Sequence, residues 1–213
     1  MTLSTSDERI ATRLPLFAER FSRLWAEVMG DDATAGPAQL QLVAAQAWLE
    51  SGVADPELGS WWKGTMEGSG NLGAIQCTKT DAGAPHYRCA AYTDEHPNGA
   101  QYSTRFRFYQ DAPGPDGASR PAADWAMVDF LSQLSVARRP RTFAALMTGD
   151  LQAYATALHT ERYYEGFGAT VEARIGGYAK AIASHLSTIA TVLDQEVAVT
   201  LPSPLATEAA AAV

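Results

Sequence analysis

The stretch AAQAWLESG, residues 44–52, closes a long apolar segment with a carboxylate. Pro37 suits the first turn of a helix, and from there to Leu49 the apolar content is nearly continuous, which predicts a helix buried on most sides. Gly52 is a typical residue just beyond a helix end. Glu50 therefore lies in the last turn of a predicted core helix, where the chain can turn away and leave its side chain facing a cavity. The same local pattern fits a glutamate in solvent, so it leaves both roles open.

Length, composition and charge restrict the class of protein. The chain has 213 residues, of which 46% are hydrophobic, enough for one domain with a real core. No apolar run approaches the roughly 18 residues that span a bilayer. The formal net charge of −8 argues against a nucleic-acid partner, whose phosphates require a basic face. It also gives no reason to expect an anionic membrane surface as a partner.

The first residues of the chain lack a basic stretch followed by an apolar one, so the sequence predicts no secretory signal peptide. We therefore expect synthesis in the cytoplasm, with any export depending on another machine. Cys77 and Cys89 flank a polar loop and form either one bridge, worth about 3 kcal/mol if unstrained, or two free thiols in a reducing cytoplasm. The four histidines have no metal-ligand spacing, so the sequence predicts no metal site.

Hydrophobic periodicity predicts helices on both sides of one small β hairpin. A glycine-rich loop at 52–70 carries an adjacent pair of tryptophans. The arrangement indicates an α+β or mainly helical domain with a β flap. The expected helices span 6–29, 37–51, 121–135, 141–147, 150–159 and 169–190, and the arms of the hairpin span 87–95 and 100–109.

The register of this hairpin decides which acidic residue shares the aromatic face of its second arm. A two-residue turn at 98–99 would pair Glu95 with Tyr102. A three-residue turn at 97–99 with a bulge would give that place to Asp94. The proline in the turn cannot donate the backbone hydrogen bond that the shorter turn requires, which favours the second register. The pattern alone does not choose between the two acids.

Two carboxylates that flank a cleft are the minimum equipment for cleaving a glycosidic bond. One of them must stay protonated near neutral pH, which requires a poorly solvated place that raises its pKa. Glu50, at the end of an apolar helix, fits that role. The second carboxylate is then expected on a flexible or β element facing the helix, where Asp94 and Glu95 are the candidates.

Short motifs occur in order across about residues 38–186. Their residues are Ala45-Gln46, Glu50-Ser51-Gly52, Asn71-Leu72, Ile75, Thr93, Glu95, Asn98-Gly99, Phe106-Arg107 and Tyr109. With a late tyrosine motif, they make five motifs that resemble those of the bacterial glucosaminidase family of peptidoglycan hydrolases, whose pattern runs A-Q-x-x-x-E-S-G, N-L-F-G-I-K, T-x-E-x-x-N-G and F-R-x-Y, with a tyrosine motif before the last helix. This family includes the wall-cutting domain of flagellar rod assembly proteins, autolysin catalytic domains and phage tail or endolysin domains. The chain departs from the pattern at Gly73, at Gln76 and in the late tyrosine motif.

The resemblance implies a lysozyme-like α+β fold, mainly helical, with the small β hairpin flanking the active-site cleft. Its boundaries would be an N-terminal helix and loop at 1–36, the lysozyme-like glucosaminidase domain at 37–190 and a C-terminal tail at 191–213. The implied reaction is hydrolysis of the β-1,4 bond after N-acetylglucosamine in peptidoglycan, without a cofactor. Glu50 would be the general acid. Glu95 would activate water, or would support the substrate's own N-acetyl group electrostatically.

Several aromatic residues and one asparagine are candidate contacts for the glycan. Flat aromatic faces pack against the C–H faces of sugar rings, although each of these residues equally fits ordinary core packing. The resemblance places one tyrosine near the catalytic glutamate, and we expect this to be Tyr164. Asn71 is expected to orient the backbone beside the cleft. The full set is Trp61, Trp62, Asn71, Tyr163, Tyr164 and Phe167.

Two other functions remain open at this point. One is a muramidase or lytic transglycosylase of the same fold, in which a single glutamate suffices. The other is a non-catalytic module that binds wall glycan as a structural part of a tail-like particle. In each case the partner is a peptidoglycan glycan strand, in the periplasm or cell wall. We expect delivery there by a carrier such as a phage tail, a contractile injection particle or a secretion machine.

Overall fold

The computed structural model describes residues 5–53, 69–95, 101–164 and 168–202. This part of the chain is mainly helical, with two small antiparallel sheets, in agreement with the expected α+β class. No helix within these ranges is both long enough and apolar enough to cross a membrane. The elements are α1 (Thr5–Met29), α2 (Pro37–Ser51), β1 (Tyr87–Glu95), β2 (Gln101–Tyr109), β3 (Ala112–Pro113), β4 (Ser119–Arg120), α3 (Ala122–Leu134), α4 (Pro140–Thr148), α5 (Leu151–Thr160) and α6 (Val171–Val192).

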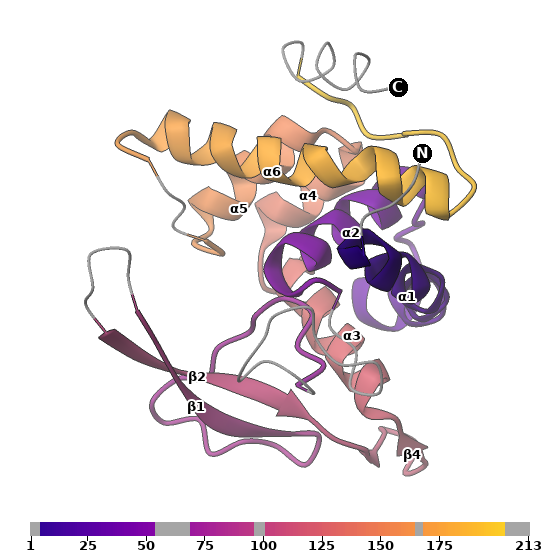
Figure 1. Cartoon of the computed structure of the whole chain (residues 1–213). Coiled ribbons are helices and arrows are strands. Elements are labelled where there is room, and N and C mark those ends of the chain that lie inside the picture. Colours follow the sequence, from indigo (N-terminus) through magenta and orange to yellow (C-terminus); the bar gives the residue numbers. More distant parts are fainter. Residues whose placement is uncertain (1–4, 54–68, 96–100, 165–167, 203–213) are drawn as a thin grey trace.

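Helix α2 lies at the centre of the helical layer, and the hairpin β1–β2 is set apart from that layer (Figure 1). Every residue from Gln39 to Trp48 is buried, which confirms the predicted burial of this helix. Helix α6 packs against α2 and α5, while α3 packs against α1. All six helices contribute to one hydrophobic core, in which α1 supplies Leu14, Phe17 and Phe21.

The hairpin adopts the second of the two registers that the sequence left open. Asp94 pairs with Tyr102, and Glu95 pairs with Gln101. This is the register that the missing N–H of the proline favours. The turn itself and the side chains of Asp94 and Glu95 lie outside the described residues.

The segment 69–77 runs along the other edge of β2 and links the hairpin to the helices. Its backbone accepts hydrogen bonds from Tyr109 N at Ser69 O (3.0 Å) and from Arg107 N at Ile75 O (3.1 Å). Farther along, Cys77 N donates to the carbonyl of Arg105 at 2.7 Å. A loop that follows a strand so closely is held by the strand's own backbone groups.

A disulfide and a carboxylate fix the base of the hairpin. Cys77 and Cys89 are bonded to each other, so of the two alternatives for these residues the bridge is present. By loop-closure entropy, a bridge across about a dozen residues contributes about 3 kcal/mol. Asp129 of α3 accepts hydrogen bonds from Arg107 (2.5 Å) and from the Tyr109 hydroxyl (3.0 Å). The hairpin is therefore anchored to both the 69–77 segment and α3.

Candidate functional site

Glu50 occupies the last turn of α2, as the sequence predicts. Gly52 follows in the left-handed conformation with φ +63°, and its N–H donates to the Trp48 carbonyl at 2.8 Å. A residue with a β-carbon would be strained there, so glycine allows the chain to leave the helix at once. The Glu50 side chain is only partly buried, although the helix before it is enclosed. Glu50 therefore stands where a packed core meets the surface.

The carboxyl group of Glu50 is held in a poorly solvated place. Burial raises its pKa from 4.5 to about 7, and the hydrogen bond from Tyr178 opposes that rise. The Tyr178 hydroxyl, on α6, donates to Oε1 of Glu50 at 2.6 Å. With a pKa near neutrality, Glu50 carries a proton in a large fraction of molecules at pH 7 and can transfer it.

Tyr178, rather than the expected Tyr164, is the tyrosine hydrogen-bonded to Glu50. Tyr164 stacks on the ring of Tyr178, with centroids 3.7 Å apart and planes 11° from parallel. Its own hydroxyl donates to the carbonyl of Ala155 at 3.0 Å. Tyr164 thus acts on Glu50 only through the ring of Tyr178. Tyr178 was not among the residues expected at the site, although it lies within the predicted helix at 169–190, whose hydrophobic periodicity is the one signal that could have found it.

Two further tyrosines and Gln46 close the inner side of the site. The Tyr154 hydroxyl donates to Oε1 of Gln46, one turn before Glu50 on α2, and the Tyr163 hydroxyl donates to the carbonyl of Gly73 at 3.2 Å. Burial, and then the charge of Glu50, raises the pKa of both hydroxyls. These groups are therefore neutral at ordinary pH, and they give Glu50 a wall that is polar but uncharged.

Asn71 forms hydrogen bonds with the protein backbone and is not placed to contact a glycan. Its amide Nδ2 donates to the carbonyls of Ile75 (2.9 Å) and Arg107 (3.2 Å), and its Oδ1 accepts from Ile75 N (2.7 Å). The side chain has no exposed surface, which leaves no atom for a direct substrate contact. Nearby, Ser51 Oγ donates to the Leu72 carbonyl at 2.9 Å. The 69–77 segment is thus tied both to the end of α2 and to β2.

The departure from the family pattern at Gly73 has a steric reason. A β-carbon there would come within 2.6 Å of Phe130 and 2.8 Å of the Tyr163 hydroxyl, so the space of the family's aromatic residue is already filled. Ala74 follows with φ +46°, a conformation that favours glycine. The pattern that the sequence resembles has glycine at this position.

Four of the expected site residues have no described side chain. Trp61, Trp62 and Phe167 lie outside the described residues, and Glu95 is described only by its backbone position in β1. The structure therefore brings together Glu50, Tyr163 and Tyr164 from the predicted set. It adds Tyr178, Tyr154 and Gln46.

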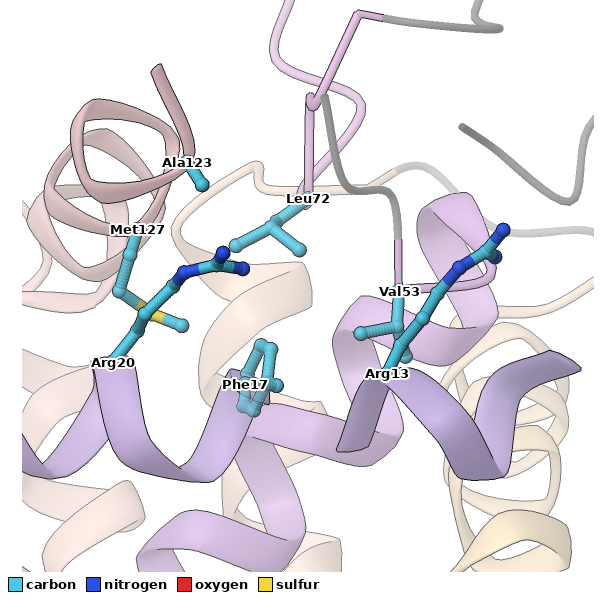
Figure 2. A pocket seen from close by; sticks show the side chains of 7 residues that line it. All are labelled: Arg13, Phe17, Arg20, Val53, Leu72, Ala123 and Met127. Atoms are coloured by element: carbon cyan, nitrogen blue, oxygen red, sulfur yellow. The ribbon is translucent and has the colours of Figure 1, made fainter. Parts of the chain in front are cut away.

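A small cavity lies between α1, α3 and the 69–77 segment. Figure 2 shows Arg13 and Arg20 rising from α1 on either side of Phe17. The cavity holds about 10 Å³, room for no more than a water molecule, so it is not a substrate site. Its lining residues are Arg13, Phe17, Arg20, Val53, Leu72, Ala123 and Met127.

Within the described ranges, one group of potential metal ligands lies close together. It consists of Cys77, Asp81 and Cys89, whose ligand atoms are all within 4.8 Å of one another. The disulfide uses both sulfur atoms, and the Asp81 carboxylate accepts from the Tyr87 hydroxyl at 3.2 Å. In this oxidised form the group is not arranged to bind a metal ion.

Comparison of the chain with models of protein families, with curated proteins and with solved structures gives no match in any of the three.

Proposed function

We propose that this protein is a peptidoglycan hydrolase of lysozyme-like fold. It cleaves the β-1,4 bond after N-acetylglucosamine, with Glu50 as the general acid. The observation that carries the proposal is the Glu50 carboxyl group, whose burial raises its pKa to about 7. The ordered motifs that resemble the glucosaminidase family support the choice of substrate, since a perturbed carboxyl group by itself indicates only acid–base chemistry.

In the proposed reaction, Glu50 gives its proton to the glycosidic oxygen as the bond to C1 breaks. Tyr178 donates to Oε1 of Glu50 at 2.6 Å, which leaves Oε2 to carry the proton. Gln46, Tyr154 and Tyr163 line the inner side of the site with uncharged groups. None of these three carries a positive charge that would lower the pKa of the Glu50 carboxyl group. Glu95 is proposed to activate the attacking water or to support the substrate's N-acetyl group.

A lytic transglycosylase of the same fold is the second candidate, because the Glu50 carboxyl group, with its pKa near 7, suits a group that both gives and takes a proton. A single glutamate that acts first as acid and then as base would need no second carboxylate. The two candidates differ in their products, because the transglycosylase closes a 1,6-anhydro ring and uses no water.

Product analysis tests the proposal and separates it from this second candidate. Purified peptidoglycan is digested, reduced with borohydride and analysed by mass spectrometry. We expect new reducing ends on N-acetylglucosamine. Reducing N-acetylmuramic acid would indicate a muramidase, and 1,6-anhydro ends would indicate a transglycosylase. The absence of any product from a folded protein would favour the non-catalytic wall-binding module.

The proposed place of action is the periplasm or cell wall, after delivery by a carrier. The Cys77–Cys89 bridge supports this, because disulfides persist mainly in oxidising compartments outside the cytoplasm. The proposed carriers are a phage tail, a contractile injection particle or a secretion machine.

Tyr178→Phe is expected to change the pH dependence of catalysis as well as its rate. The hydroxyl of Tyr178 lowers the pKa of Glu50, so its loss should raise that pKa above about 7 and move the alkaline limb of kcat/KM to higher pH. Loss of one hydrogen bond to a reacting group should also reduce kcat roughly tenfold. Tyr164→Phe is the matched control, because its hydroxyl bonds to the Ala155 carbonyl and not to Glu50. An alkaline limb that does not move in Tyr178→Phe would contradict the positioning role of Tyr178.

A further inference from the structure

Two groups stand out among the arginines of this acidic chain. In the first group each guanidinium lies against a carboxylate, as in the pairs Arg23–Asp124 (2.8 Å), Arg107–Asp129 (2.5 Å) and Arg120–Glu27 (2.8 Å). The second group gathers where α4 begins and α5 ends, and none of its members makes an ion pair with the described carboxylates. We call this second group the arginine rim. It consists of Arg138, Arg139, Arg141 and Arg162.

One carboxylate brings the two halves of the rim together. Glu161 accepts hydrogen bonds from the backbone N–H groups of Arg141 (3.1 Å) and Thr142 (2.8 Å) in the first turn of α4. Arg162 is the next residue after Glu161, so it is held close to the start of α4. The four arginines and Glu161 together carry a formal charge of +3, in a chain whose formal charge is −8. The chain therefore keeps a basic site on an acidic surface.

The charges of the rim are crowded. Burial and then the neighbouring Arg138 lower the pKa of the Arg139 guanidinium, and the charge of Glu161 opposes this lowering only in part. Arg139 itself is anchored, because its Nη1 donates to the carbonyl of Gln133 at 2.6 Å. The side chains of Arg138, Arg141 and Arg162 are exposed. An anion placed among these three would relieve the repulsion and accept charge-assisted hydrogen bonds.

The rim adjoins the wall of the candidate active site. The Cζ atom of Arg139 lies 5.2 Å from the centre of the Tyr163 ring, and the Tyr163 hydroxyl bonds to Gly73 O in the segment beside α2. One aromatic ring thus separates the rim from the surroundings of Glu50. Two open grooves start at the rim. One of about 510 Å³ is lined by Arg138 together with Glu27, and one of about 590 Å³ is lined by Arg141 together with Asp150.

We propose that the arginine rim binds the carboxylate groups of the peptide stems of peptidoglycan while Glu50 acts on the glycan. This inference rests on the proposed function. The glycan backbone offers few charges once its lactyl groups are in amide linkage, whereas every peptide stem carries free carboxylates. Arginine matches the planar carboxylate with two parallel hydrogen bonds. The rim would then let an acidic protein hold an acidic polymer, because it places positive charge only where the stems lie.

The test measures binding in the Glu50→Gln background, so that the polymer is not digested. Sedimentation with intact peptidoglycan compares this parent with a version that also carries Arg138→Gln, Arg141→Gln and Arg162→Gln. Loss of three exposed ion pairs between these arginines and the stem carboxylates should weaken binding about tenfold. The difference in affinity between parent and variant should shrink at high salt. On peptidoglycan whose stem carboxylates have been amidated, parent and variant should bind equally.

A matched control removes three exposed positive charges elsewhere, by Lys79→Gln, Arg88→Gln and Lys180→Gln. It should bind intact peptidoglycan as the parent does, and thermal unfolding should show that all three proteins are folded. The proposal is overturned if the rim variant binds like the parent, if the control loses as much affinity, or if the loss persists on amidated stems. Wild-type digestion together with unchanged binding of the rim variant would reject the rim while the proposed function stands. Rim-dependent binding without any digestion would reject the proposed catalysis instead.

Discussion

Glu50→Gln should lower the turnover of purified peptidoglycan by about 100-fold or more while the protein stays folded. Glutamine keeps the size of the side chain and can still accept the hydrogen bond from Tyr178, but it has no proton to transfer. The measurement is the release of soluble fragments at several pH values. Glu8→Gln, an exposed change of the same type on α1, is the control and should keep full activity. Near-wild-type clearing by a folded Glu50→Gln protein would rule out the general-acid role.

The same substitution should stabilise the protein at neutral and alkaline pH. The folded-state pKa of Glu50 is about 7 and its ordinary value is 4.5, so the folded protein binds this proton more tightly than the unfolded chain does. Wild-type stability therefore falls as pH rises from about 4.5 to 7, by about 3 kcal/mol in total. Glu50→Gln has no such loss. The two proteins should differ little in free energy of unfolding at pH 4 and most at pH 8. A constant difference across this range would mean that Glu50 is not held in a poorly solvated place.

Substitutions at the hairpin acids should have unequal effects. Glu95→Gln is expected to lower kcat about 100-fold, because a carboxylate that activates water contributes on that order. Asp94→Asn should lower it less than about threefold. The reason for this ranking is the motif Thr93-x-Glu95-x-x-Asn98-Gly99, and it goes against the observed pairing of Asp94 with Tyr102. Steady-state kinetics on one soluble glycan substrate measures both.

The two acids differ by one position along a strand, so the outcome is informative in either direction. Successive residues of a strand point to opposite faces, and only one of the two can face a given cleft. The reverse ranking would mean that the motif is displaced by one residue in this chain. Equal and small effects would favour chemistry that uses Glu50 alone, as in a transglycosylase.

Helix α2 and its end could be predicted from the sequence because their causes are local. Pro37 starts the helix, a continuous apolar run buries it, and Gly52 supplies the left-handed turn that ends it. The hairpin was predictable for the same reason, since alternation and turn residues act over a few positions. The location of Glu50 at a helix end was therefore determined by the sequence alone.

The hairpin register and the disulfide could be decided only from the tertiary structure. Turn chemistry left two registers nearly equal, and the choice is accompanied by contacts far from the turn, where Arg107 and Tyr109 bond to Asp129 on α3. The distance between Cys77 and Cys89 depends on how the loop between them folds, so spacing alone left the bridge open.

The surroundings of Glu50 show most clearly what could not be predicted from the sequence. Periodicity predicts the helix that carries Tyr178, but it does not say which of its inward residues meets which partner. The hydrogen bond to Glu50 joins residues 128 positions apart, and it exists because α6 packs across α2. The sequence alone determined that an acidic residue ends a buried helix. Only the packing of α6 and the 69–77 segment decided that its carboxyl group is poorly solvated, since desolvation depends on every atom nearby, whatever its place in the chain.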